Sequence, residues 1–282
     1  MKMRIFVLVF IFLLNACSVY SAVNPRYEVL EQWSLPVALA ESSGLYCDQY
    51  GHTFNINDSG NVPVIYQLDP NAIISGQYPL KVKNIDWEAL TGDADYLYIG
   101  DIGNNNGQRQ SLNIHKISKG QLDQGEAVSL DVSYIGNQPN LNEILNHDFD
   151  AEALVAVKDH LVLFSKSWQT DVLRVYLLDK SQLKQQVTPY VTVSNLPGVI
   201  TGATYDPVTK QYILVGYPSK QLGFGVPFMV ILSDNFTFIE HIQLTGYGQV
   251  EAVCHRVSGE IWFTQESSIF SSAKLVKIRL RN

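Results

Sequence analysis

The feature that most constrains the fold of this chain is a short segment that recurs five times. Each copy is a polar residue followed by small and apolar residues, and the copies begin at intervals of 47, 64, 49 and 50 residues. A polar turn follows every copy, and a second apolar run follows the turn. Short apolar runs joined by turns rich in Asp and Gly indicate β-hairpins. The repeat therefore predicts five copies of one hairpin, which begin at Glu41, Glu88, Glu152, Thr201 and Glu251.

Further strand-like runs extend each hairpin to a four-stranded unit. We expect second strands at residues 52–56, 96–100, 160–165, 211–216 and 260–264, and third strands at 62–68, 112–117, 172–178, 227–232 and 274–280. Fourth strands are expected at 80–85, 128–134, 187–193 and 238–244, and the fifth unit ends before one. Residues 26–35 form one more strand-like run. Pairing it with the fifth unit would close a ring and remove the exposed sheet edges.

This pattern predicts an all-β fold, namely a five-bladed β-propeller of four-stranded antiparallel blades closed by the N-terminal strand. Residues 26–282 would form this single domain. A six-bladed ring is the alternative, because the interval of 64 residues leaves room for further structure within residues 119–151. We expect residues 136–147 to be a loop.

The N-terminal residues predict export. Two basic residues precede an apolar run over residues 5–14, which is too short to span a bilayer and is typical of a signal peptide over residues 1–16. The run ends in Leu14-Asn15-Ala16-Cys17, which resembles the lipobox of bacterial lipoproteins. In that family the cysteine is lipidated, so Cys17 would carry the anchor, and residues 17–25 would form a tether. Ser18 would then favour an outer-membrane lipoprotein that faces the periplasm. The alternative is cleavage after Ser21, which would yield a soluble periplasmic or secreted protein.

The net charge and the cysteines of the chain indicate which classes of partner and which state of the thiols we expect. The formal net charge is −7, and removal of the signal peptide with Lys2 and Arg4 makes the chain more acidic still. An acidic chain without basic clusters repels phosphate backbones, so we expect no nucleic-acid partner. We expect a monomer that meets a membrane only through the lipid anchor and binds a small ligand or an envelope protein. Cys47 and Cys254 could pair in an oxidising compartment, but we expect buried free thiols in strands.

The repeat brings polar residues to one mouth of the central channel, since the innermost strands begin there and the second strands end there. Carboxylates that face a common axis repel one another, and a bound cation, protonation or the nearby basic residues Lys166, Lys220 and Arg109 would relieve that repulsion. Oxygen ligands without clustered His or Cys favour Ca²⁺ or Mg²⁺. The expected cation ligands are Glu41, Glu88, Asp101, Asn104, Glu152 and Glu251, and the expected ligand-binding residues are Asn57, Asp58, Lys166, Trp168 and Tyr217. Alternatively, the repeated glutamates accept backbone N–H groups and join neighbouring blades.

Several motifs in the first half of the chain resemble those of bacterial exported propellers related to the SdiA-regulated and phytase-like esterase families. They are Glu41-Ser-Ser-Gly-Leu, Asn57-Asp-Ser-Gly-Asn, Asp86-Trp-Glu-Ala-Leu, Tyr98-Ile-Gly-Asp-Ile-Gly-Asn and Asp150-Ala-Glu-Ala-Leu. The resemblance covers most of residues 40–170, implies a propeller and is compatible with a central metal. A phytase-like propeller needs clustered basic residues to hold phosphate, and this sequence offers few, so the resemblance does not extend to phytase activity.

Two functions are compatible with these residues. The first is a non-enzymatic envelope lipoprotein whose propeller face binds a ligand or a protein, with a cation at the mouth. The second is a metal-dependent hydrolase of an ester, lactone or phosphoester, in which Glu88, Glu152 or Asp101 would act as general base. The sequence contains no Gly-x-Ser-x-Gly nucleophile motif and no clear order of Ser, His and Asp. No catalytic residue is therefore assigned, and we favour binding.

Overall fold

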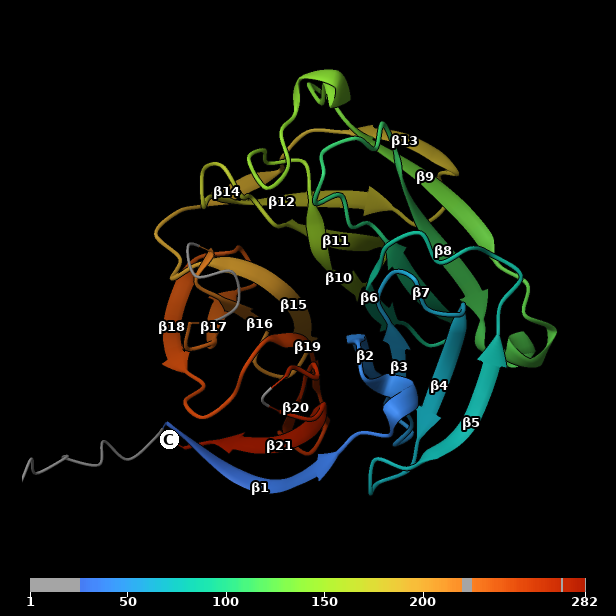
Figure 1. Ribbon diagram of the computed structural model, residues 1–282, viewed down its shortest axis with the longest axis vertical. Helices are drawn as coiled ribbons and strands as arrows, with labels where there is room; N and C mark the ends of the chain where they lie inside the picture. Colours follow the sequence, from blue (N-terminus) through green and yellow to red (C-terminus); the bar gives the residue numbers. More distant parts are fainter. Residues whose placement is uncertain (1–25, 220–224, 270, 282) are drawn as a thin grey trace, which may run out of the picture.

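Five β-sheets form a ring around a central channel (Figure 1). The computed structural model describes residues 26–219, 225–269 and 271–281. The predicted five-bladed propeller is confirmed, and the six-bladed alternative is wrong. The expected signal peptide, the tether and Cys17 lie outside the described residues. Within the described part of the chain, no helix has the length and apolar character needed to cross a membrane.

The blades follow one another along the chain. The strands of the first two are β2 (Ser42–Cys47), β3 (Thr53–Asn57), β4 (Val64–Leu68) and β5 (Ile74–Pro79), then β6 (Trp87–Gly92), β7 (Tyr96–Asp101), β8 (Leu112–Ser118) and β9 (Val128–Tyr134). The third and fourth blades contain β10 (Ala151–Val157), β11 (His160–Ser165), β12 (Leu173–Asp179) and β14 (Val191–Val193), then β15 (Val199–Asp206), β16 (Gln211–Tyr217), β17 (Phe228–Ser233) and β18 (Phe238–Gln243). The fifth contains β19 (Val250–His255), β20 (Ile261–Gln265), β21 (Lys274–Leu280) and β1 (Tyr27–Ser34). Three short 3-10 helices occur in the described connections: η1 (Val37–Leu39), η2 (Lys119–Gln124) and η3 (Pro139–Leu141).

The ring closes between the two ends of the chain. Strand β1 pairs antiparallel with β21, so that Tyr27 lies opposite Leu280, as the unpartnered N-terminal run predicted. A disulfide between Cys47 and Cys254 adds a covalent link from β2 to β19. The expectation of free thiols is therefore wrong. Ring closure brings the innermost strands of the first and last blades side by side, so that the Cα atoms of Cys47 and Cys254 lie 5.6 Å apart. The sequence alone does not indicate this proximity, because the two cysteines are 207 residues apart.

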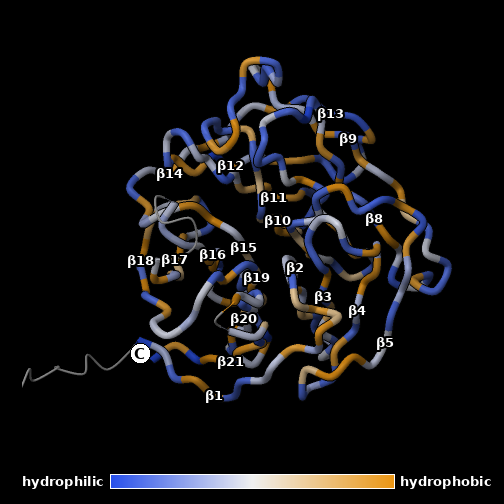
Figure 2. The backbone as a smooth tube through the Cα atoms, in the orientation of Figure 1, coloured by the Kyte–Doolittle hydropathy of each residue, from blue (hydrophilic) through white to orange (hydrophobic). Residues whose placement is uncertain are grey.

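The hydrophobic core is divided into five clusters, and each lies between two neighbouring blades. Residues of the first blade, such as Ile56, pack with residues of the second, such as Trp87 and Ile99, and equivalent clusters fill the other four interfaces. Apolar residues accordingly concentrate in the strands (Figure 2). Each blade therefore buries both of its faces against its neighbours.

Two of the predicted outer strands are placed differently in the structure. In the first blade the outer strand is β5, residues 74–79, and not residues 80–85. The Asp69 carboxylate accepts the backbone N–H groups of Asn71 and Ile73 and closes a tight turn, so the strand begins directly after it. In the third blade residues 187–193 divide into two strands. β13 (Lys184–Val187) pairs in parallel with β9 of the second blade, and β14 pairs with β12. Pro189 lies between them and has no N–H to continue a ladder.

Residues 136–147 form a loop that contains η3, as expected, and its end reaches the channel opening.

Candidate functional site at the mouth of the channel

A β-bulge interrupts every innermost strand at the equivalent position. In β6, for example, Trp87 pairs with Asp101 and Ala89 with Gly100, so that Glu88 is the extra residue. A bulge redirects a side chain and locally ends regular pairing. The five extra residues, one in each blade, are Ser43, Glu88, Glu152, Thr201 and Glu251.

In three blades the residue that follows the second strand is polar and lies beside this bulge. The backbone N–H of Asp58 bonds to the carbonyl of Glu41, that of Lys166 to the carbonyl of Asp150, and that of Glu266 to the carbonyl of Gln249, at 2.9–3.0 Å. These three exit residues therefore occupy equivalent positions in three blades. Their side chains line the opening of the channel together with those of four bulge residues, Ser43, Glu88, Glu152 and Glu251.

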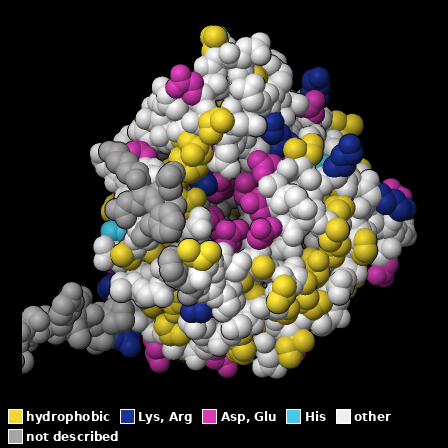
Figure 3. Space-filling model, in the orientation of Figure 1, with side chains coloured by type: hydrophobic (Ala, Val, Ile, Leu, Met, Phe, Trp, Pro, Cys, Tyr) yellow, Lys and Arg dark blue, Asp and Glu magenta, His cyan; other side chains and the backbone are white. Residues whose placement is uncertain are grey.

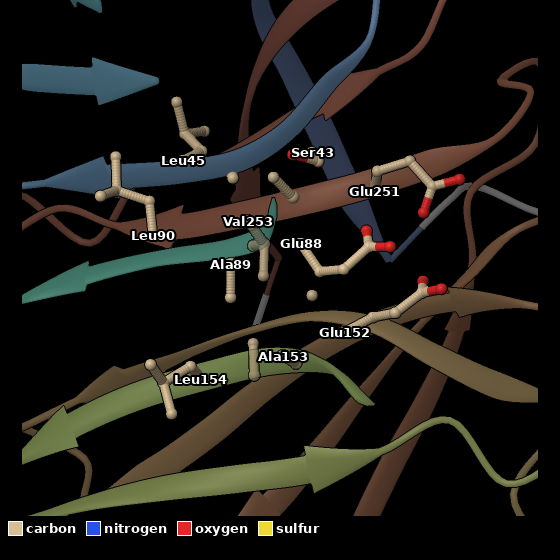
Figure 4. Close-up of a pocket in the computed structure, with 14 residues that line it drawn as sticks. Ser43, Leu45, Glu88, Ala89, Leu90, Glu152, Ala153, Leu154, Glu251 and Val253 are labelled. Atoms are coloured by element: carbon tan, nitrogen blue, oxygen red, sulfur yellow. The ribbon is translucent and has the colours of Figure 1, made fainter. Parts of the chain in front are cut away.

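The opening holds a pocket of about 390 Å³, which we call the mouth. Figure 3 shows Asp and Glu side chains gathered around it. Below the mouth the channel narrows to a cavity of about 10 Å³, and in Figure 4 the carboxylates of Glu88, Glu152 and Glu251 lie at one end of it, with leucine side chains at the other. A ligand therefore has room only above this constriction. The mouth is lined by Ser43, Asp58, Glu88, Asn105, Ile144, Leu145, Glu152, Lys166, Trp168, Tyr217, Gln249, Glu251 and Glu266.

Three carboxylates at the mouth converge on one point. Each of Asp58, Asp86 and Glu88 offers an oxygen within 4.8 Å of the others. Glu88 is buried and has no hydrogen-bond or ion-pair partner among the described residues. Gly103 allows this approach, because a Cβ atom at that position would meet the carboxylates of Asp86 and Glu88. Oxygen ligands in this arrangement suit a hard divalent cation such as Ca²⁺ or Mg²⁺.

Among the residues that the structure describes, Lys166 is the one basic side chain that lines the mouth. Its ammonium group contacts the carboxylate of Glu152, and both side chains are buried. The same Nζ lies 4.7 Å from the ring centroid of Trp168 and 5.4 Å from that of Tyr217. Trp168 is fixed in turn by a hydrogen bond from Nε1 to the carboxylate of Asp150 at 2.8 Å. This part of the mouth holds an alkylammonium group between a carboxylate and two aromatic rings.

The mouth makes negative charge costly. Burial, followed by the charge of Glu152, raises the pKa of Glu88 well above its ordinary value, and burial with Glu266 does the same to the pKa of Glu251. Burial raises the pKa of Asp86 to about 6 and that of Glu266 to about 8. Burial also raises the pKa of Glu152 to about 8, although Lys166 opposes it.

The carboxylates around Lys166 keep its side chain in the charged form. Burial alone would lower the pKa of Lys166, but the carboxylates of Glu152 and Glu251 hold it well above its ordinary value. The ammonium group therefore remains charged, and a further positive charge in the mouth would relieve the carboxylates.

Other residues predicted for the site have different surroundings. Glu41 is exposed on the rim, where it accepts a hydrogen bond from Asn61. It lies two residues before the bulge, as Asp86 and Asp150 do in the next blades. The Asp101 carboxylate pairs with Arg109 at 2.8 Å and lies 3.5 Å from His115. Burial opposes them, but these two neighbours lower the pKa of Asp101.

Two predicted amides also have partners within the protein. Asn104 donates from Nδ2 to the carbonyl of Phe149 and accepts the N–H of Arg109. Asn57 donates to the carbonyl of Ala38. Of the predicted cation ligands, Glu88, Glu152 and Glu251 line the mouth; of the predicted ligand-binding residues, Asp58, Lys166, Trp168 and Tyr217 do.

Sequence reasoning did not assign Ser43, Asp86 and Glu266 to the site. A signal was present for Asp86, because Asp86-Trp-Glu-Ala-Leu and Asp150-Ala-Glu-Ala-Leu share one pattern. For Glu266 the signal was its position directly after a second strand, which it shares with Asp58 and Lys166. The residue type of Ser43 gave no indication that it belongs to the site.

The fold resembles that of solved β-propellers. A PQQ-bound aldose sugar dehydrogenase from Streptomyces coelicolor superposes with a TM-score of 0.54 at 10% identity, over 90% of this chain and 98% of that chain. A streptogramin B lyase gives a TM-score of 0.46 at 10% identity, over 90% and 98% of the two chains. A catalytically inactive virginiamycin B lyase from Staphylococcus aureus gives 0.44 at 13% identity, over 89% and 70%. No protein-family model and no curated protein matches the chain. The first likeness supports the propeller fold alone.

Proposed function

We propose that this protein is an exported binding protein whose propeller holds a divalent cation at the mouth and presents it to a small ligand or an envelope protein. One observation carries the proposal. Asp58, Asp86 and Glu88 converge within 4.8 Å, and Glu88 is buried without a partner among the described residues. Three oxygen donors leave further positions on Ca²⁺ or Mg²⁺, which prefer six or more oxygens. Two of the three donors, Asp58 and Glu88, also line the pocket of the mouth.

Calorimetry with CaCl₂ and MgCl₂ tests the cation. We expect the purified protein to bind one of them, and the double variant Asp86→Asn/Glu88→Gln to lose that binding. The matched control is Asp123→Asn/Asp234→Asn, which removes two exposed carboxylates far from the mouth and should bind as the unmodified protein does. Absence of binding in the unmodified protein would reject the cation and favour a purely structural role for the glutamates.

The proposal includes an N-terminal lipid on Cys17 and an outer-membrane location facing the periplasm. The disulfide between Cys47 and Cys254 supports export, because such bonds persist in oxidising compartments. Strand β1 runs toward the mouth and leads into β2, so its first residue lies on the opposite face of the ring. An anchor before residue 26 would therefore leave the mouth directed away from the membrane. Detergent-phase partitioning of the protein, lost in Cys17→Ser, is the expected result.

A metal-dependent hydrolase of an ester, lactone or phosphoester is the second candidate, and one observation favours it. Glu152 lies beside the cation cluster, and its pKa of about 8 suits proton transfer near neutral pH. A bound cation would supply polarisation of the scissile bond. The excess of carboxylates disfavours phosphoesters among these substrates. Turnover of an ester or lactone that Glu152→Gln abolishes, while cation binding persists, would establish this function.

A further inference from the structure

The mouth consists of two acidic halves with different geometry. Asp58, Asp86 and Glu88 form the compact half already assigned to a cation. Glu152, Glu251 and Glu266 form the second half, around Lys166. Among the described residues, these three do not converge closely enough to form a group that could hold a metal ion. The second half therefore suits a larger cation than a bare metal ion.

When its carboxyl groups are ionised, the second half carries more negative than positive charge. Its three carboxylates face one ammonium group, that of Lys166, which contacts Glu152. Glu251 is only 9% exposed and has no hydrogen-bond or ion-pair partner within the described part of the chain, yet it lines the pocket. Glu266 lines the pocket as well and likewise has no partner among the described side chains. Glu251 is buried and Glu266 is half-buried, and a carboxylate withdrawn from water without a partner is costly, so a positive ligand would stabilise both groups.

Lys166 demonstrates which positive group this environment accommodates. Its ammonium lies on a carboxylate and near the rings of Trp168 and Tyr217, as an organic ammonium does in an aromatic site. Ile144 and Leu145 extend the apolar wall of the same pocket. A hydrated inorganic ion gains nothing from such a wall, whereas the methylene groups of an alkylamine bury apolar surface against it.

We propose that the second half of the mouth binds a linear di- or polyamine, with an ammonium group at Glu251 and Glu266 and its methylene chain along Trp168 and Leu145. The inference deepens the proposed binding function by naming the class of ligand. It does not depend on the cation, because the two halves use different carboxylates. Anionic ligands are disfavoured by the same excess of negative charge.

Calorimetry with putrescine and spermidine, with and without saturating CaCl₂, tests the inference. We expect the purified protein to bind at least one amine, and Glu251→Gln/Glu266→Gln to weaken that binding at least tenfold while cation binding persists. Asp123→Asn/Asp234→Asn makes the same change in net charge on the exposed surface and should leave amine affinity unchanged. Both variants are first compared in urea unfolding.

Tryptophan fluorescence gives a second readout that does not depend on the folding of the Glu251→Gln/Glu266→Gln variant. Spermidine should change the tryptophan fluorescence, and Trp168→Phe should remove that change. Cation binding without any amine binding would overturn the inference and leave the proposed cation site intact. Equal loss of amine affinity in the surface control would also overturn it, because the net charge of the protein, and not a site at the mouth, would then attract the amine. Amine binding without cation binding would support the inference and reject the cation.

Discussion

The ammonium group of Lys166 lies against the carboxylate of Glu152 at the mouth of the channel, and both side chains are buried. Lys166 comes from the end of β11 and Glu152 from the bulge of β10, so one hairpin supplies both. The pair places the ammonium group of Lys166 where it offsets several carboxylates at once.

Replacement of Lys166 should therefore destabilise the fold. Lys166→Met leaves Glu152 buried without a counter-charge, and loss of one partner of a buried pair costs about 3–5 kcal/mol. The cost should be largest near pH 9, where the carboxyl is ionised, and smaller near pH 6, where it takes up a proton. Urea unfolding at both pH values measures it. The double variant Lys166→Met/Glu152→Gln should recover most of the stability; if it does not, the contribution of Lys166 lies in its packing rather than in this pair.

The raised pKa values predict how stability varies with pH. Glu152 and Glu266 have an ordinary pKa of 4.5 and a pKa of about 8 in the fold. Between these values the folded state binds more protons than the unfolded state, so stability falls as pH rises from about 4.5 to about 8. Urea unfolding in EDTA at pH 5, 6.5 and 8 should show this fall.

Two comparisons identify the source of that fall. Glu266→Gln removes one of the titrating groups and should make the dependence on pH shallower. Added CaCl₂ should stabilise the protein most at pH 8, because the cation binds the ionised carboxylates. If stability in EDTA were independent of pH, ionisation of the carboxylates at the mouth would not destabilise the fold.

The blade count and the inner hairpins could be predicted because they depend on local patterns. The turns between first and second strands recur with the glutamates, and the period of the repeat is that of a blade. Glu88, Glu152 and Glu251 could be placed at the mouth for the same reason. The outer strands were less predictable, because their position depends on turn geometry at Asp69 and on the interruption at Pro189.

The other differences arise from register and from long-range contacts. Glu41 resembles the repeated glutamates by type, but the bulge of its blade falls on Ser43, and residue type does not reveal a bulge. Asp101 follows a strand as a ligand would, yet the loop after it returns Arg109 to its carboxylate. The disulfide depends on closure of the whole ring. Each of these facts requires the three-dimensional arrangement.

Gly103 should be essential for the cation site although it supplies no ligand. A Cβ atom there would lie 2.5 Å from Glu88 Oε1 and against the Asp86 carboxylate, so Gly103→Ala must displace both. We expect cation affinity to fall at least tenfold in calorimetry. Gly248→Ala is the matched control on the same face, because its nearest neighbour, Gln265, would be 3.6 Å away. Unchanged affinity in Gly103→Ala would show that Asp86 and Glu88 do not bind the cation together.

The disulfide should contribute to stability without affecting the mouth. It joins residues separated by 207 positions, and chain entropy predicts about 5 kcal/mol for a loop of this length, at the upper end of measured effects. Cys47→Ser/Cys254→Ser should therefore lower the urea midpoint markedly, and a reducing agent should do the same to the unmodified protein but not to the variant.

Cation and amine binding should persist in that variant, because the bond lies in the β2 and β19 strands and not among the residues that line the mouth. Unchanged stability would mean that pairing of β1 with β21 closes the ring sufficiently by itself. Lost binding together with lost stability would mean that the mouth requires the two inner strands to be held at a fixed distance, since Ser43 and Glu251 lie on those same strands.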